Sequence, residues 1–345
     1  MPREAKIFVA GAAGMVGSAI IRKLIDLGYT NIISSYHHKK PGASLYTMDP
    51  EEHTMPDGVI LHPVDLASQA QVKKFFNEVK PKFVFMAAAR VGGMYANNTY
   101  PASFIYENLT IQGNVIHAAY EARVERLLFL GSSCIYPRLS PQPMTEEHLL
   151  TGLLEPTNKP YAIAKIAGIK MCEAYNRQYN TRFIALTPTN LYGPNDNFDL
   201  ENSHVVPALM RKLHDAKMSG RKAVVIWGSG SPRREFLHVD DVAKAAVFVM
   251  NLNDKTVADE FLSYPRPCFV NVGSGIECTI WELTAKIRKA VNYEGEIVFD
   301  SSRLDGAPKK LLDDSRLAGL GWRHSIGLDQ GIEQTYGWYL GTREE

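Results

Sequence analysis

Three glycines near the start of the chain constrain its fold more than any other feature. Gly11, Gly14 and Gly17 follow the apolar run Lys6–Ala10 directly and open a predicted helix over Gly17–Leu27. Glycine permits a tight strand–helix turn in which backbone N–H groups at the helix N-terminus approach an anion closely. An ordinary strand–helix turn is the alternative, but the strand before and the helix after favour a dinucleotide pyrophosphate. The predicted phosphate loop consists of Gly11, Gly14, Met15, Val16 and Gly17.

The same alternation of apolar runs and helical patterns continues over the first 190 residues. Strands are predicted at Lys6–Ala10, Asn31–Ser35, Phe83–Ala87, Leu127–Leu130 and Phe183–Thr187. Helices are predicted at Gly17–Leu27, Gln69–Val79, Pro101–Ala122 and Tyr161–Tyr179. Continuously apolar strands separated by helices indicate a parallel sheet covered on both faces, which is a doubly wound α/β domain of the Rossmann type.

The pattern changes after Pro188, and 345 residues are too many for one core. Helices are predicted at Val205–Ala216, Asp240–Leu252 (with an Asp cap), Ile280–Val291 and the C-terminus, and strands at Ala223–Trp227, Phe269–Val272 and Glu296–Phe299. We expect an NADP-binding domain of residues 1–189 plus about 235–272. A smaller mixed α/β substrate-binding lobe would take about 190–234 plus 273–345. Lys39–Gly58 is predicted to be a surface excursion.

Composition excludes several classes of function. The formal net charge is +1, so nothing suggests a nucleic acid or a membrane surface as partner. The four cysteines show no CxxC pairing, which argues against a zinc site or a disulfide framework. Neither a signal peptide nor a long apolar span is visible. The sequence therefore predicts a cytoplasmic protein without a metal site.

The end of the second predicted strand carries no acidic residue. It runs Ser34-Ser35-Tyr36-His37-His38-Lys39-Lys40, whereas a strand that selects NAD usually ends in a carboxylate that binds the ribose hydroxyls. A basic cluster suits the 2′-phosphate of NADP instead, so we predict NADP(H) as cofactor. A solvated basic loop is the alternative, and His37, His38 and Lys39 are equal candidates for the phosphate contact.

Tyr161-x-x-x-Lys165 places a phenol and an ammonium group on one face of a helix that Pro160 opens. A phenol has a pKa near 10 and is a poor base at neutral pH. A positive charge about 5 Å away is worth roughly 3 kcal/mol, or about two pKa units, which would let the tyrosine exchange a proton during hydride transfer. A surface helix pair is the alternative, but the position, about 150 residues after the glycine loop, favours catalysis.

Ser132, Ser133 and Cys134 follow the predicted strand Leu127–Leu130. A serine hydroxyl there would hydrogen-bond a carbonyl that is about to become an alcohol, and Ser132 is a better candidate than Ser133. A cysteine could abstract a proton next to a carbonyl if its thiolate were stabilised. A buried inert cysteine is the alternative, and these residues alone leave both interpretations open.

The GxxGxxG spacing resembles the short-chain dehydrogenase/reductase superfamily, which implies that Asp65 lies near the adenine and that Ala87, Ala88 and Ala89 lie beside the cofactor. Longer runs resemble the GDP-L-fucose synthase family over nearly the whole chain. They are Asn97–Asn108, Gly131–Pro137, Leu154–Tyr179, Pro188–Phe198, Ser203–Lys212, Trp227–Asp241 and Asp305–Asp313. That family epimerises C3 and C5 of GDP-4-keto-6-deoxy-D-mannose and reduces the C4 ketone with NADPH.

The resemblance assigns roles by position. Ser132, Tyr161 and Lys165 match the family triad, Cys134 the epimerisation base, and His204 the acid. Histidine suits that role because its unperturbed pKa lies near neutral pH. Without the resemblance, His204 would be a helix-start histidine with a structural hydrogen bond.

Further positions match the family's binding residues. Arg234 is a candidate for the diphosphate, whereas Lys212 stands where relatives can carry arginine. The full set of substrate candidates is Ser133, Asn190, His204, Val205, Lys212, Trp227, Arg234 and Lys310, and the further cofactor candidates are Pro188, Asn190 and Leu191. For each charged residue, a solvated surface position is the alternative.

The predicted helices Ser103–Ala119 and Tyr161–Tyr175 carry apolar or aromatic residues on more than one face. Relatives pair these helices into a four-helix bundle, so we expect a homodimer. Two other functions stay open. One is another nucleotide-sugar 4-epimerase or 4,6-dehydratase, which would recycle a tightly held NAD. The other is a catalytically silent NADP-binding regulator.

Overall fold

A parallel sheet forms the larger part of the molecule in the computed structural model, which describes residues 1–37, 42, 46, 56–200, 202–302, 305 and 307–342. Its seven strands are ordered β10-β6-β5-β4-β1-β2-β3, and every pair is parallel. The strands are β1 (Ile7–Ala10), β2 (Ile32–Tyr36), β3 (Val59–Pro63), β4 (Phe83–Met86), β5 (Arg126–Leu130), β6 (Phe183–Pro188) and β10 (Phe269–Val272). The predicted doubly wound sheet is confirmed.

Strand β3 was not predicted, because it lies at the sheet edge and its side chains are only partly covered. An edge strand needs no continuous apolar run, so the sequence signal on which the other strands were recognised is missing there. His38, Lys39 and most of the predicted excursion Lys39–Gly58 lie outside the described residues.

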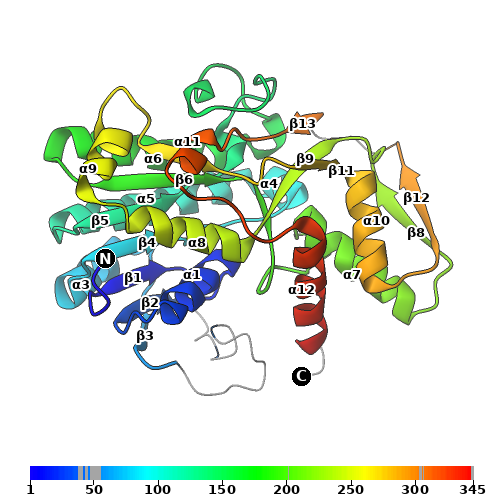
Figure 1. Cartoon of the computed structure of the whole chain (residues 1–345), viewed down its shortest axis with the longest axis horizontal. Coiled ribbons are helices and arrows are strands. Elements are labelled where there is room, and N and C mark those ends of the chain that lie inside the picture. The colour runs from blue at the N-terminus through cyan, green and yellow to red at the C-terminus, as the bar shows by residue number, and fades with distance from the viewer. Residues whose placement is uncertain are drawn as a thin grey trace.

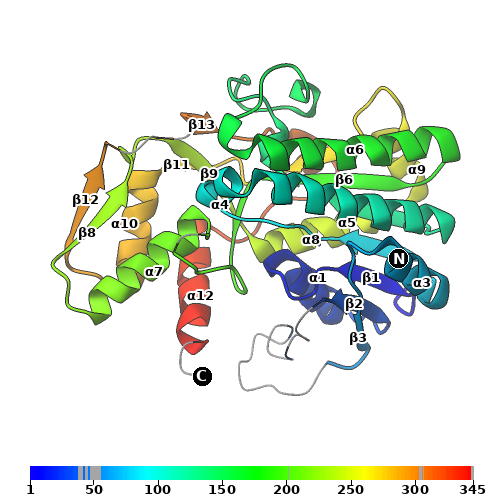
Figure 2. The same ribbon diagram turned by 180° about the vertical axis from the view of Figure 1, so that it is seen from behind.

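Helices cover both faces of the sheet. One face carries α1 (Met15–Asp26) and α8 (Val239–Met250), which are in front in Figure 1. The other carries α3 (Gln69–Val79), α5 (Pro101–Glu121) and α6 (Lys159–Tyr179), as the reverse view in Figure 2 shows. Two hydrophobic clusters fill these layers, one around Ile20 and Val242 and the other around Phe76 and Ile169.

The start of α8 differs from the prediction of an Asp cap. Strand β9 runs to His238, which is itself the N-cap of α8, and its Nδ1 accepts from the backbone N of Asp240 at 3.3 Å. The cap is therefore the histidine, because the strand leads directly into the helix and leaves the aspartates inside the first turn, where they favour the helix dipole.

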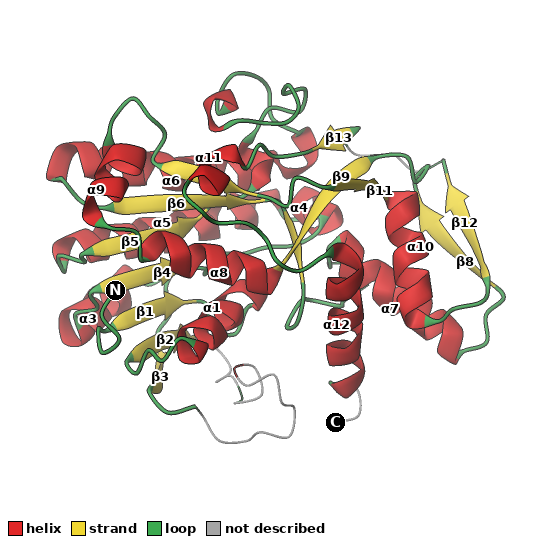
Figure 3. Cartoon of the chain, viewed as in Figure 1, coloured by secondary structure: helices red, strands yellow, loops and turns green. Residues whose placement is uncertain are grey.

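The smaller lobe lies beside the sheet domain and has its own core (Figure 3). It contains α7 (Val205–Met218), α10 (Ile280–Val291), α12 (Leu328–Gly341) and the parallel pair β8 (Ala223–Trp227) and β12 (Glu296–Asp300). The predicted helices and strands of this region are found. Their apolar side chains, among them Leu213 and Ile287, pack together in that core.

A small sheet joins the two parts, with β9 at its centre. Its strands are β7 (Asn190–Tyr192), β9 (Arg233–His238), β11 (Glu277–Thr279) and β13 (Lys309–Lys310). The remaining helices are short: α4 (Met94–Thr99), α9 (Asp254–Val257) and α11 (Ser315–Gly319). Strands β7, β11 and β13 have only two or three residues and carry too little pattern to be predicted. The longer β9 was missed because it begins with Arg233, Arg234 and Glu235 and so has no continuous apolar run. The division into residues 1–189 plus about 235–272 and the remainder stays a prediction, although α11 places Leu317 in the core of the sheet domain.

Candidate active site

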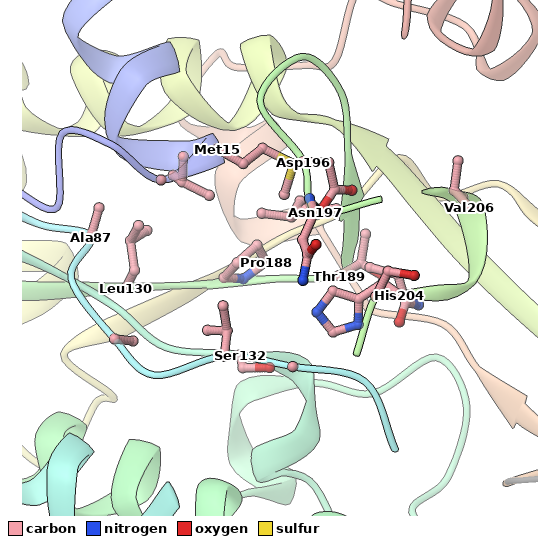
Figure 4. Close-up of a pocket in the computed structure, with 18 of the residues that line it drawn as sticks. Met15, Ala87, Leu130, Ser132, Pro188, Thr189, Asp196, Asn197, His204 and Val206 are labelled. Carbon is pink, nitrogen blue, oxygen red and sulfur yellow. Dashed lines mark hydrogen bonds between the residues drawn. The ribbon is translucent and has the colours of Figure 1, made fainter. Parts of the chain in front are cut away.

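A cavity of about 460 Å³ opens where the carboxyl ends of the sheet strands face the smaller lobe. This edge is where open parallel α/β sheets bind their ligands. Figure 4 shows side chains from α1, β5, β6 and the start of α7 pointing into one space. Of the residues predicted from the sequence, the cavity is lined by Gly14, Met15, Val16, Gly17, Ala87, Ala89, Ser132, Ser133, Tyr161, Lys165, Pro188, Asn190, Leu191, His204 and Val205.

The glycine loop forms a phosphate cradle at the start of α1. Among the described residues, no side chain caps the helix at Gly14, so its first N–H groups are available to a ligand. A Cβ at Gly17 would lie 2.0 Å from the carbonyl oxygen of Gly11, and Gly11 itself has φ +94°. Only glycine allows this approach, and the cradle fits the pyrophosphate of a dinucleotide.

The adenine end of the predicted cofactor site lies beyond the cavity lining. His37 Nε2 is 3.6 Å from Asp65 Oδ2, and Asp65 Oδ1 accepts from the backbone N of Ala67. Gly11 and Ala88 lie behind the cavity wall, where a Cβ at Gly11 would be 2.8 Å from the backbone N of Ala88. The structure thus brings His37 and Asp65 together at the ends of adjacent strands.

Helix α6 places Tyr161 and Lys165 beside the end of β5. The ammonium group of Lys165 donates to the carbonyl oxygen of Leu130 at 2.8 Å and lies 5.7 Å from the centroid of the Tyr161 ring. Both residues line the cavity with Ser132. This arrangement brings a phenol, an ammonium group and a hydroxyl to one wall.

The electrostatics of Tyr161 differ from the sequence prediction. Burial raises the pKa of the phenol, although a hydrogen bond with Ser132 acts in the opposite direction. Burial also lowers the pKa of Lys165 to about 8. The predicted lowering of the tyrosine pKa is not found, because desolvation of the anion is the largest influence and the nearby Cys134 also raises the pKa. In this state Tyr161 is a neutral phenol, the form that can give a proton.

Cys134 lies in a short turn, Ser133–Ile135, that begins at Ser132. Its backbone N donates to Ser132 Oγ at 3.4 Å, and the residue is only 6% exposed. Burial raises the pKa of the thiol, while Lys310 is the largest of the influences that favour the thiolate. Cys134 therefore stays protonated in this state, behind the Ser132 and Ser133 that line the cavity.

His204 is the N-cap residue of α7, and its imidazole projects into the cavity (Figure 4). Desolvation by the surrounding protein lowers the pKa of the imidazole below its usual value. The neutral imidazole is therefore the main form at neutral pH, and the imidazolium is more acidic than that of an exposed histidine.

The candidates for the nucleotide end lie outside the cavity lining. Lys310 on β13 pairs in register with Arg234 on β9, and burial lowers the pKa of both groups. Arg234 further lowers the pKa of Lys310, as expected for neighbouring cations. Lys212 Nζ lies 5.8 Å from the ring centroid of Trp227, which is 65% exposed. The structure thus forms two basic positions, one pair of cations and one cation beside an indole.

The cavity is also lined by polar residues that were not predicted from the sequence, namely Thr189, Asn195, Asp196, Asn197, Asn202 and Ser203. Asp196 Oδ1 accepts from the backbone N of Asn197 at 2.7 Å, whereas its Oδ2 is buried without a hydrogen-bond partner in the described part of the chain. Burial raises the pKa of this carboxyl to about 7. These residues lie in or near the runs Pro188–Phe198 and Ser203–Lys212, which the sequence had already singled out. Their residue types alone, however, do not indicate a chemical role.

Replacing Asp196 by asparagine is expected to change how stability depends on pH. The native carboxyl binds its proton up to about pH 7, whereas the unfolded one loses it near pH 4. Between these values the native state holds more protons, so the carboxyl lowers stability as pH rises, by roughly 4 kcal/mol at most. Urea unfolding of the protein without cofactor at pH 4.5 and pH 8 should show that Asp196→Asn raises the free energy of unfolding relative to the unaltered protein, and by more at pH 8. An equal increase in the free energy of unfolding at the two pH values would contradict this assignment.

The described residues show neither a metal site nor a membrane-spanning helix. They contain no group of three or more His, Cys, Asp or Glu side chains arranged to hold a metal ion. Their helices are all too short or too polar to cross a lipid bilayer.

Comparison with known proteins identifies close relatives. A model of the NAD dependent epimerase/dehydratase family matches residues 7–263. The chain is 52% identical over 338 residues to GDP-L-fucose synthase 1 of Arabidopsis thaliana, covering 98% of this chain and 94% of that protein. It is 50% identical over 335 residues to GDP-L-fucose synthase of Escherichia coli, covering 97% and 96%. A solved GDP-mannoheptose C4 reductase from Campylobacter jejuni with NADP bound superposes with a TM-score of 0.81 at 36% identity, covering 99% of each chain.

Proposed function

This chain belongs to the NAD dependent epimerase/dehydratase family, and we propose that it acts there as a GDP-L-fucose synthase. The proposal rests on one observation: Ser132, Tyr161, Lys165 and His204 line the same cavity as the glycine cradle. Cys134 lies directly behind the wall of that cavity. A plain 4-epimerase or dehydratase needs no such cysteine. Curated GDP-L-fucose synthases that cover nearly the whole chain at about half identity support the same conclusion.

The enzyme uses a nicotinamide cofactor, and we propose NADPH. Bound in the cradle of Gly14 and Gly17, the cofactor would supply a hydride to the substrate. The absence of an acid at the end of β2 and the NADP bound in the Campylobacter jejuni relative both favour the phosphorylated form. His37 is the described candidate for the 2′-phosphate. Its neighbour Asp65 would then be left to hydrogen-bond the adenine side.

Reduction of the C4 ketone requires a proton for the oxygen as hydride arrives at the carbon. Tyr161 is a neutral phenol with its hydroxyl on the cavity wall, so it is the donor. Ser132 hydrogen-bonds the same oxygen and the phenol. Lys165, anchored on Leu130, stabilises the tyrosinate that the transfer leaves behind.

Epimerisation precedes reduction because the C4 ketone acidifies the C–H bonds at C3 and C5. Cys134 takes the proton from one face and His204 returns a proton from the opposite face, which inverts each centre. The pKa of Cys134 lies above its usual value in the protein without substrate. The thiolate therefore forms only when Lys310 and Lys165 stabilise it, the two cations whose fields already act on the thiol.

The GDP-sugar would reach from this cavity to the basic positions beyond it. Arg234 and Lys310 suit the diphosphate, and Trp227 with Lys212 suits the base or ribose. Asn190 donates its side-chain amide to the carbonyl oxygen of Glu235, which places it between the two regions.

We propose a homodimer formed by α5 and α6, which pack side by side on one face of the sheet (Figure 2). Their outer surface exposes Tyr106 at 70% and Leu109 and Ile163 at 38% each. Sizing chromatography with light scattering should give twice the mass of the chain, and Tyr106→Glu should shift it toward monomer by placing a charge in the interface. A monomer for the unaltered protein would contradict the dimer.

We also propose a cytoplasmic location, which agrees with the four free buried cysteines.

The direct test is incubation with GDP-4-keto-6-deoxy-D-mannose and NADPH, following loss of NADPH absorbance and the stereochemistry of the product. The proposal expects one NADPH consumed for each GDP-L-fucose formed. Purified protein with stoichiometric bound NAD and no NADPH consumption would point to a 4-epimerase or 4,6-dehydratase instead. NADPH binding without turnover of any keto-sugar would point to a silent regulator.

A further inference from the structure

Glu235 is a fully buried carboxylate in the small sheet that joins the two parts of the molecule, and the mechanism above does not use it. It lies on β9, directly after Arg234 and before Phe236, which lines the cavity. A buried carboxylate costs free energy unless its oxygens are well hydrogen-bonded, so its partners indicate what it does.

The main partners of Glu235 are backbone N–H groups from two different segments, and the Ser274 hydroxyl is a further donor at 3.5 Å. Oε1 accepts from the backbone N of Ser274 at 2.6 Å and of Gly275 at 2.8 Å. Oε2 accepts from the backbone N of Leu312 at 3.1 Å. A Cβ at Gly273 would lie 2.4 Å from Oε1, so the loop approaches as closely as glycine permits. One carboxylate thus joins the β10–β11 loop to the chain that follows β13.

The segment held by Oε2 carries Lys310. Strand β13 consists of only Lys309–Lys310, and Leu312 follows two residues later. So short a strand makes few ladder hydrogen bonds, and its position depends on the contacts on either side of it. Before it, Arg233 N donates to the carbonyl oxygen of Pro308 at 2.8 Å. After it, Leu311 hydrogen-bonds to Gln142 and Met144, and Leu312 N donates to Glu235 Oε2, the contact that ties this segment to β9.

The position of Lys310 matters because its register partner is Arg234. Arg234 lowers the pKa of Lys310, as expected for cations side by side, while Glu155 acts on both groups in the opposite direction. An anion that bridges the two cations would stabilise both, and a diphosphate has the charge to do so. The pair works as a clamp only while both strands keep their register.

We propose that Glu235 is the positioning residue that holds Lys310 beside Arg234 and so forms the diphosphate site. The inference rests on the function proposed above. A carboxylate is required because both oxygens face N–H donors. The amide of a glutamine would turn an NH₂ group toward one of the two segments and lose that contact without changing the shape of the side chain.

Glu277 provides a matched control. It lies on β11 opposite Glu235 in register, and it pairs with Arg233 at 2.7 Å and with Lys309 at 3.0 Å. Those cations are the sequence neighbours of Arg234 and Lys310. Glu277→Gln therefore removes a carboxylate of the same sheet that contacts the same two strands, but it leaves Arg234, Lys310 and the bond from Leu312 to Glu235 in place.

The test measures the affinity for GDP and, separately, for NADP⁺ by isothermal titration calorimetry on the full chain. We expect Glu235→Gln to weaken GDP binding about tenfold or more and to leave NADP⁺ binding within about twofold. Glu277→Gln should leave both affinities within about twofold. Equal GDP affinities for the two variants would overturn the inference. An equal loss of affinity for GDP and for NADP⁺ in Glu235→Gln would also overturn it, because that result indicates a general structural role.

A third variant separates this inference from the proposed function. If Arg234→Met binds GDP as tightly as the unaltered protein, the nucleotide site itself is misplaced and the proposed function is in error. If Arg234→Met loses affinity for GDP and Glu235→Gln does not, only the role of Glu235 is overturned. If circular dichroism shows that Glu235→Gln does not fold, Glu235→Asp replaces it in the test. Its side chain keeps the charge but is too short to reach both segments, so the same changes in affinity are expected. Failure of both to fold overturns a positioning role.

Discussion

Replacing Tyr161 by phenylalanine is expected to stop C4 reduction and to leave epimerisation intact. The substitution removes only the hydroxyl, and the ring keeps its edge-to-face contact with Phe104 at 6.3 Å. Loss of a general acid lowers a rate by about 10²–10⁴-fold, so NADPH consumption should fall by that factor. Cys134 and His204 are untouched, and solvent deuterium should still enter C3 or C5 of the keto-sugar, as mass spectrometry or NMR would show.

Tyr179→Phe is the matched control, because Tyr179 ends the same helix far from the cavity and is 42% exposed. Both activities should remain in this variant. If Tyr161→Phe reduced the ketone at a normal rate, the proton donor would have to be another group, and Ser132 would be the next candidate. If the variant also lost deuterium exchange, Tyr161 would take part in epimerisation, and the proposed separation of the reduction and epimerisation residues would be wrong.

Replacing Cys134 by serine is expected to abolish the exchange of deuterium at C3 and C5. The side chain is nearly isosteric and the site is buried, so the fold should persist, but a hydroxyl loses its proton far less readily than a thiol. The exchange rate should fall by about 10²-fold or more, by analogy with other lost bases. NADPH and GDP affinities should be unchanged because Cys134 binds neither.

The control for this change is Cys268→Ser. Cys268 is equally buried, and its Sγ donates to the carbonyl oxygen of Ile169, a bond that a serine can also make. Exchange should persist in that variant.

Because burial raises the pKa of Cys134, the exchange rate of the unaltered enzyme should also rise with pH through the neutral range as more thiolate forms. Full exchange in Cys134→Ser would remove the base assignment.

The sheet domain was predictable because its strands are buried on both faces and its helices carry regular apolar stripes. The glycine cradle and the Tyr161–Lys165 helix were recognisable for the same local reason, since each depends on spacing along one short segment. Cys134, His204, Arg234 and Lys310 were assigned through the family resemblance, and the roles proposed for them remain predictions. No local pattern distinguishes them from buried or solvated residues of the same type.

Local order along the chain thus determined the strands and helices of the doubly wound sheet, the position of the cofactor loop and the identity of the catalytic helix, because each is recognisable from a pattern within one short segment. The tertiary structure alone decided the edge strand β3, the small joining sheet, the burial of Asp196 with its Oδ2 unpartnered among the described residues, and the contact of Glu235 with Leu312, 77 residues later. It also decided the pKa directions of Tyr161 and Cys134. Burial and long-range register are properties of the packed chain, and desolvation there outweighs the charge effects that spacing suggests.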